Sequence, residues 1–131
     1  MNLIVKKYGG TSVATATKIK NIAKKIVDES RSSKIVVVLS AMGKTTDQLV
    51  SLANKCSKNP DGRDYDLLVS SGEQVSISLL SMAIKQLGKD SIAYTGWQAG
   101  IKTNNTHASA RITQIDTSRI KKSLKEGKIV I

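Results

Sequence analysis

The chain has 131 residues, the size of one domain with its own core, and its formal net charge is +11. Its single cysteine excludes an internal disulfide and agrees with a reducing compartment. The apolar stretch before Lys6 is too short for a signal peptide or a membrane-spanning helix. We therefore expect a cytoplasmic protein with no membrane partner.

The positive charge suits anionic partners such as phosphorylated ligands, acidic metabolites or nucleic acid. The lysines are spread over polar positions of helical patterns, as in "KIKNIAKK" and "IKKSLKEGK", which is typical of solvated helix faces. Aromatic residues make up only 3% and none interleaves with the basic runs, which argues against a stacking platform for single strands. No helix-turn-helix, zinc or RNP-type pattern occurs. We expect no nucleic-acid partner, and a basic nucleic-acid-binding α/β domain stays as an alternative.

The first half of the chain alternates apolar runs with helical patterns. Residues 3–5 predict a buried strand, and "KIVVVLS", residues 34–40, predicts a strand that is buried on both faces. Residues 45–56 predict a helix with Cys56 on its apolar side, and therefore a core cysteine. Residues 15–30 predict another helix, whose apolar stripe consists of Ile19, Ile22, Ala23, Ile26 and Val27.

The second half begins after the turn-forming segment "NPDGR". We expect an unusually apolar helix over 71–87, a third strand over 91–96, a loop or hairpin excursion over 101–116, a short basic helix over 116–126 and a buried fourth strand over 128–131. Strands that alternate with helices predict an α/β fold with a mainly parallel sheet, because parallel strands need crossover connections.

The first strand leads directly into "KYGGTSV", residues 7–13. Gly9 and Gly10 permit positive φ and let backbone N–H groups approach a ligand closely. The start of the following helix favours anions, and Lys7 adds a full positive charge. The lysine precedes the glycines, so this is not the P-loop spacing. Either a phosphate cradle or an ordinary glycine turn fits these residues.

Two further segments carry polar residues next to predicted helices. In "SAMGKTTDQL", Ser40 ends the second strand, and Thr45 with Gln48 matches a helix capping box, so Thr45 or Thr46 would cap the helix. In "SSGEQV", Ser71 and Gln74 match the same pattern, which would place Glu73 in the first helical turn. The helix dipole favours a carboxylate there, and so would a ligand's ammonium group. The residues alone leave both interpretations of Glu73 open.

Metal-ligating residues do not cluster in the sequence. His107 lies in a polar stretch with no second histidine or cysteine nearby, which predicts a surface histidine. We therefore expect no metal site built by the protein. Magnesium that arrives with a nucleotide would need few protein ligands.

Four segments, in this order along essentially the whole chain, resemble the N-terminal part of the bacterial lysine-sensitive aspartate kinases. They are "KYGGTSV", "VVVLSAMGKTTDQL", "SSGEQVSISLLSMA" and "YTGWQAGI". The resemblance implies an amino acid kinase fold, a three-layer αβα sandwich, with residues 1–131 as its N-terminal, amino-acid-binding lobe. The nucleotide lobe and the regulatory ACT domains of the family have no counterpart in these residues, so we expect this piece to be inactive alone.

The resemblance also implies a reaction: transfer of the ATP γ-phosphoryl group, with Mg²⁺, to the β-carboxylate of L-aspartate, giving 4-phospho-L-aspartate and ADP. That step opens the biosynthesis of lysine, threonine, methionine and diaminopimelate. The residues that match the family's ATP-phosphate contacts are Lys7, Tyr8, Gly9, Gly10 and Ser40, and Lys7 is the one expected to act in catalysis. The matching substrate contacts are Thr46 and Glu73, with Glu73 pairing with the aspartate ammonium group.

Two other possibilities stay open beside this one. A kinase for another acidic metabolite, such as glutamate or carbamate, would share the fold. A non-catalytic assembly module would explain the apolar 71–87 helix, and homo-oligomerisation through that helix is compatible with catalysis. The helix has two apolar stripes: one holds Val75, Leu79, Met82 and Ala83, and the other holds Ile77, Leu80 and Ile84. Because two apolar sides require two partners, we expect this helix to lie in a subunit interface as well as on the core, and burial of both Ile77 and Ile84 within one chain would count against that interface.

Overall fold

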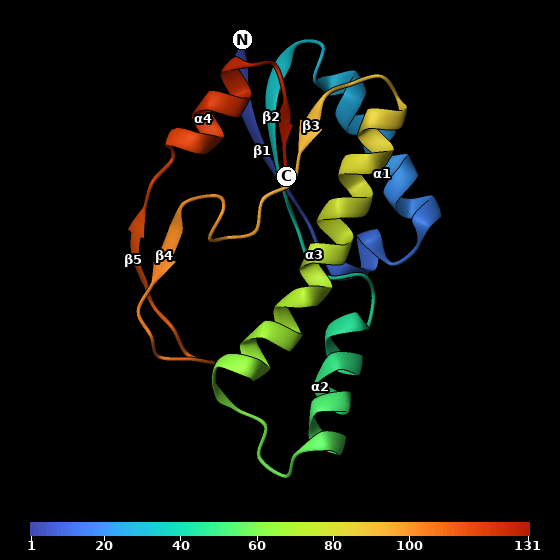
Figure 1. Ribbon diagram of the computed structural model, residues 1–131. Coiled ribbons are helices and arrows are strands. Elements are labelled where there is room, and N and C mark those ends of the chain that lie inside the picture. Colours follow the sequence, from blue (N-terminus) through green and yellow to red (C-terminus); the bar gives the residue numbers. More distant parts are fainter.

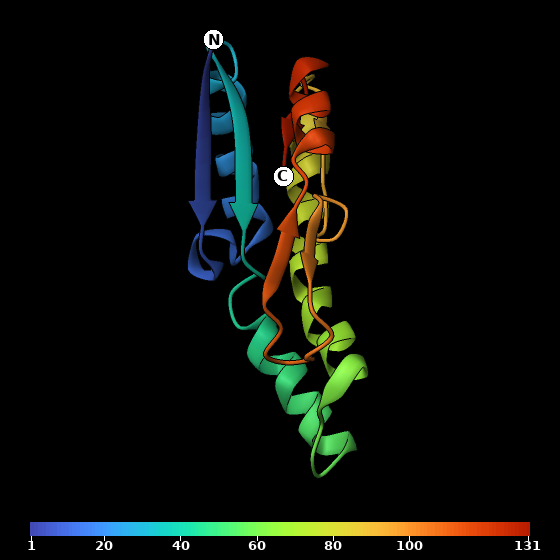
Figure 2. The same cartoon turned by 90° about the vertical axis from the view of Figure 1, so that its left-hand side faces the viewer.

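The computed structural model describes residues 1–131 as three layers (Figures 1 and 2). Figure 2 views the sheet from the side of helix α4, with α1 and α3 behind it. The predicted α/β sandwich is therefore confirmed. In chain order, the elements are β1 (Asn2–Tyr8), the 3-10 turn η1 (Gly10–Val13), α1 (Ala16–Glu29), β2 (Ser33–Leu39), α2 (Thr45–Cys56), α3 (Gly62–Gln86), β3 (Ser91–Ile92), β4 (Ile101–Thr103), β5 (Ile112–Ile115), α4 (Ser118–Lys125) and β6 (Ile129–Val130).

The main sheet has four parallel strands in the order β1-β2-β6-β3. The final strand β6 lies between β2 and β3, and Ile129, Val130 and Ile131 are all buried, as expected for an interior strand. The excursion over 101–116 is an antiparallel hairpin formed by β4 and β5. The core joins one face of the sheet to α1 and α3, and its largest members are Ile26, Ile35, Leu80, Ile84 and Ile129.

Helix α1 follows the predicted pattern closely. The Thr15 side chain caps it by accepting a hydrogen bond from the Lys18 backbone N–H at 3.2 Å. Four residues of its predicted stripe, Ile19, Ile22, Ala23 and Ile26, are buried, and Val27 is partly buried against the same core.

The first two strands are covered on one face only, which corrects two predictions. Residues 3–5 do not form a buried strand, because Leu3 and Val5 are 57% and 63% exposed. In β2, which was expected to be buried on both faces, Val38 is 49% exposed. The register pairs Lys7 with Val38 and Val5 with Val36, so these side chains share the face opposite α1 and α3. Helix α4 packs beside β6, and Figure 2 shows no element in front of β1 and β2.

Helix α3 is a single helix of 25 residues, from Gly62 to Gln86, and does not start at Ser71 as predicted. Between Arg63 and Ser71 the chain contains no glycine or proline, so the helix continues through these residues. The Ser71 hydroxyl donates to the Leu68 carbonyl at 2.6 Å, within the helix, and caps nothing. Glu73 consequently lies far from the first turn, and the dipole argument for its position does not apply.

The two apolar stripes of α3 also differ from expectation. Ile77, Leu80 and Ile84 are all buried in the core of this chain, and the burial of Ile77 and Ile84 counts against the predicted subunit interface through this helix. The other stripe is the open one: Val75, Leu79 and Met82 are exposed. By length and composition α3 could cross a membrane, and 33% of its most apolar 18-residue window is buried inside this chain.

Cys56 is exposed, although its pattern predicted a core position. It is the last residue of α2, which contacts the rest of the chain mainly through α3. Only Ala53 of α2 is buried, so the apolar side of this helix is much narrower than its sequence suggests.

Candidate functional site

The loops that follow β1 and β2 meet at the carboxyl edge of the sheet, where open α/β folds bind ligands. The Ser40 backbone N–H donates to the Tyr8 carbonyl at 3.1 Å. The Gly43 N–H donates to the Gly10 carbonyl at 3.0 Å. These bonds join "KYGGTSV" and "SAMGK", and they bring together four residues that the sequence predicted for one site: Tyr8, Gly9, Gly10 and Ser40.

Gly9 and Gly10 are needed for different reasons, and neither adopts the positive φ that the sequence suggested. Gly9 is extended, with φ of −78°, and an added Cβ would meet no atom within 4 Å. At Gly10 an added Cβ would lie 2.9 Å from the Ala41 carbonyl oxygen and 3.1 Å from that of Gly43. Gly10 therefore lets the two loops pack against each other, while Gly9 leaves open space beside them.

This difference gives a prediction. Gly10→Ala should lower the free energy of unfolding by about 1–3 kcal/mol, because the methyl group would press on backbone that has little room to move. Gly9→Ala should change it by less than about 0.5 kcal/mol. Thermal or urea unfolding of both variants measures the contrast. Equal destabilisation would show that the loops are not in close contact at Gly10.

Strand alternation separates the two neighbouring lysines of β1. Lys6 points to the α1 side and forms an ion pair with Glu29, whose hydrogen bond raises the pKa of the Lys6 ammonium group above its ordinary value. Lys7 points to the opposite face, is exposed, and its side chain forms no hydrogen bond or ion pair. Lys6 therefore fastens the edge strand to α1, and Lys7 is the cation available to a ligand.

The start of α2 corrects the predicted capping box. Lys44 is the N-cap residue and provides no side-chain cap. The Thr45 hydroxyl donates to the Met42 carbonyl at 2.6 Å, which closes the loop before the helix. Thr46, in the first turn, is half-buried and its hydroxyl has no partner within the chain. Of the two threonines, Thr46 is thus the one free to bind a ligand.

Glu73 borders a cavity of about 690 Å³, within the size range of small-molecule sites. Its carboxylate is half-buried and has no hydrogen bond or ion pair within the chain. The cavity lies between the end of β2, helix α3 and the segment that precedes β4, and its lining includes Ser70, Gln74, Ile77, Tyr94 and Trp97. Lys7, Gly9, Gly10, Ser40 and Thr46 do not line it, so Glu73 stands somewhat apart from the other predicted residues.

Trp97 lines the same cavity and was not among the site residues that the sequence predicted. It is 74% exposed and is the only tryptophan of the chain. Its signal in the sequence was the segment "WQAG", residues 97–100, which lies between the predicted third strand and the predicted excursion and carries a large aromatic residue. As the sole indole in a lining that also includes Glu73, it is a built-in fluorescent reporter for this cavity.

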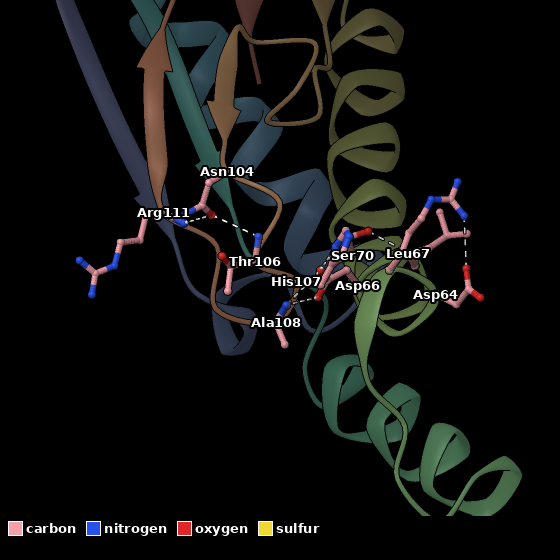
Figure 3. A network of polar contacts seen from close by, with 10 residues as sticks. Asp64, Asp66, Leu67, Ser70, Asn104, Thr106, His107, Ala108 and Arg111 are labelled. Carbon is pink, nitrogen blue, oxygen red and sulfur yellow. Dashed lines mark hydrogen bonds and ion pairs between the residues drawn. The ribbon is translucent and has the colours of Figure 1, made fainter.

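The loop of the β4–β5 hairpin is fastened to α3 about two turns before Glu73, as Figure 3 shows. Asp66 accepts a hydrogen bond from the Ala108 backbone N–H at 3.1 Å, and His107 Nδ1 lies 3.1 Å from its carboxylate. Within the loop, Asn104 Oδ1 accepts from the Arg111 N–H at 3.0 Å. His107 is on the surface, as predicted, and no three His, Cys, Asp or Glu side chains form a potential metal site.

Comparisons with known proteins agree on one group of relatives. The model of the amino acid kinase family matches residues 2–131. Aspartokinase 2 of Bacillus subtilis is 54% identical over the whole chain, and the chain spans 32% of its length. The crystal structure of aspartate kinase from Synechocystis matches 98% of the chain and 21% of its own, with 42% identity and a TM-score of 0.81. The structure of E. coli aspartokinase III in complex with aspartate and ADP, at 19% identity and a TM-score of 0.78, matches in fold.

Proposed function

Since this chain belongs to the amino acid kinase family and has aspartokinase relatives along its entire length, we propose that it forms the amino-acid-binding lobe of an aspartate kinase. The reaction is transfer of the ATP γ-phosphoryl group to the β-carboxylate of L-aspartate, which gives 4-phospho-L-aspartate and ADP. The chain spans about a third of the length of its curated relatives. We therefore assign turnover to the longer polypeptide and expect none from residues 1–131 alone.

Two observations together carry this proposal. The sequence is highly similar to aspartokinases, and the loops after β1 and β2 form an open edge of the sheet with a free positive charge. Phosphoryl transfer depends mainly on positioning and on neutralising charge. The side chain of Lys7 is unpaired, Gly9 leaves space for phosphate oxygens to approach the backbone, and Ser40 is hydrogen-bonded to Tyr8, the residue between them. These features suit the phosphate side of the reaction, with Tyr8 and Gly10 completing the loop.

The acceptor side requires little acid–base chemistry. An aspartate β-carboxylate is ionised at neutral pH. One of its oxygens attacks the γ-phosphorus, the bond to the bridging oxygen breaks, and the electron pair leaves on ADP. In our proposal Glu73 holds the substrate ammonium group and Thr46 donates a hydrogen bond to the substrate. Lys7 balances the negative charge that shifts during transfer.

Magnesium fits this arrangement as a companion of the nucleotide. Mg²⁺ keeps several waters and binds phosphate oxygens with one or two protein groups, so it needs no cluster of carboxylates, and none is present. When bound, it would neutralise phosphate charge next to Lys7 and Gly9.

The function is tested with the full-length polypeptide that contains residues 1–131. With ATP and Mg²⁺, ADP release should require L-aspartate, and glutamate or carbamate should not replace it. Acceptor activity with glutamate or carbamate alone would assign the chain to another kinase of the same fold. In residues 1–131, quenching of Trp97 fluorescence by aspartate, absent in Glu73→Gln, would locate acceptor binding in the cavity.

The second part of the proposal is homo-oligomerisation through the exposed stripe of α3, in place of an interface that involves Ile77 and Ile84. Val75, Leu79 and Met82 are exposed, and Leu79 and Met82 line a groove of about 600 Å³ whose other lining residues include Ile19, Lys20, Lys24 and Leu87. Such a surface suits a second copy of the chain. Light scattering should show a dimer or larger species in which Met82→Lys weakens assembly, and a monomer at all concentrations would refute this part.

A cytoplasmic location without a membrane or nucleic-acid partner completes the proposal. The substrates are small and water-soluble, and the lysines of α1 are exposed. A filter-binding titration checks the alternative, because binding to the phosphate backbone would fall steeply with salt.

A further inference from the structure

Ser76 connects the loop at Ser40, which does not line the cavity, with the turn of α3 that carries Glu73, which does. Its side chain is fully buried in α3. The hydroxyl oxygen lies 2.8 Å from the Ser40 carbonyl oxygen and 3.0 Å from the Glu73 carbonyl oxygen. A serine within a helix ordinarily donates to its own helix, three or four residues back. Here the nearer acceptor belongs to a loop 36 residues away in the sequence.

A steric contact one turn earlier reinforces this connection. A Cβ added at Gly72 would lie 3.0 Å from the Ala41 Cβ and 3.4 Å from Thr45 Cγ2. Helix α3 therefore approaches the loop after β2 as closely as a glycine allows. That loop is in turn fixed to the first loop by the bonds from Ser40 to Tyr8 and from Gly43 to Gly10.

The result is one connected chain of contacts from the phosphate side to the acceptor side. Gly10 and Gly72 both lie so close to Ala41 that an added Cβ would press on it, and Ser76 ties Ser40 to the helical turn that carries Glu73. The Ser76 hydroxyl has a single proton to donate, and either carbonyl can receive it. Whichever carbonyl accepts the hydrogen bond, the Ser76 side chain lies between the backbone at Ser40 and the backbone at Glu73.

We infer that Ser76 is a positioning residue, which sets the distance between the Ser40 loop and Glu73. This inference rests on the proposed function, because it assigns the two segments to the donor and the acceptor of the phosphoryl group. Ser76 is buried and would touch neither substrate. Its effect on the reaction would come through alignment, where a misplacement of about 1 Å can cost roughly a hundredfold in rate.

The kinetic test is Ser76→Ala in the full-length polypeptide. We expect kcat to fall about 10- to 100-fold, while KM for aspartate and for ATP each stay within about twofold, because the binding groups themselves remain. Ser76→Cys preserves the side-chain volume with a weak donor and should resemble the alanine variant. Ser76→Thr retains the hydroxyl group and should recover part of the rate.

Ser81 provides the matched control. It is a buried serine of the same helix, and its hydroxyl lies 3.0 Å from that of Ser91, away from both loops. Ser81→Ala should lower thermal stability by a similar amount and leave kcat unchanged. An equal loss of kcat in both variants, or an unchanged kcat in Ser76→Ala, would overturn the inference.

A second readout does not depend on activity and separates this inference from the proposed function. In residues 1–131, Ser76→Ala should speed hydrogen exchange at the Ser40 and Gly43 amides, and Ser81→Ala should not. Unchanged exchange in Ser76→Ala would overturn the inference even in an active kinase. If the unaltered polypeptide does not phosphorylate aspartate, the proposed function fails and the exchange result still decides whether Ser76 holds the loop.

Discussion

Lys7→Ala in the full-length polypeptide is expected to lower kcat about a hundredfold, which corresponds to about 3 kcal/mol of transition-state stabilisation. The reason is geometric: Lys7 lies at the carboxyl end of β1, has no partner within the chain and faces away from the core. Its charge is therefore available to the transferring phosphoryl group, and its removal should affect folding little. Steady-state kinetics and thermal unfolding measure the two effects.

Lys6 gives a control that differs by one position. Lys6→Ala removes the same charge from the same strand but breaks the ion pair with Glu29. We expect a small loss of thermal stability, as for other partly exposed ion pairs, and a nearly unchanged kcat. A near-normal kcat in Lys7→Ala, or the same loss in both variants, would remove Lys7 from the mechanism.

Glu73→Gln is expected to raise KM for aspartate at least tenfold and to leave KM for ATP almost unchanged. The amide keeps the size of the side chain and loses the charge that would pair with the substrate ammonium group. A hydrogen bond to a charged group contributes about 1.5–3 kcal/mol, which gives the expected factor. Initial rates at varied aspartate, with ATP saturating, and then at varied ATP provide both constants.

Asp64 is a suitable comparison for Glu73. It is an exposed carboxylate in the first turn of the same helix, next to Arg63 and outside the cavity. Asp64→Asn should leave both KM values unchanged. If Glu73→Gln instead changed KM for ATP, the acceptor would not bind at Glu73.

The sequence predicted most of the elements, because periodicity reports which face of an element meets the core. The stripe of α1, the parallel strands and the buried final strand all followed from it. It failed where burial depends on a neighbouring element. A β-branched run such as 34–40 has the same appearance whether one or both faces are covered. Cys56 fits a helical stripe of which only Ala53 is buried.

The site was predicted in part for a similar reason. The loops after β1 and β2 could be placed together, because parallel strands end at the same edge of a sheet. The predicted start of α3 was wrong, because Ser71 and Gln74 have the sequence pattern of a capping box but lie inside a continuous helix. The reason for Gly10, which is contact with Ala41, depends on a second loop 30 residues later and has no local signal.

The place of β6 has a consequence for the order in which the protein can fold during synthesis. β1, α1 and β2 are consecutive and can associate as soon as they leave the ribosome. β3 cannot join them, because its only partner in the sheet is β6, and β6 is translated after the hairpin and α4. Until then the inner edge of β2 stays unpaired and open to other chains. A nascent chain stalled before Lys128 should therefore hold a two-stranded intermediate, which chaperones would have reason to protect.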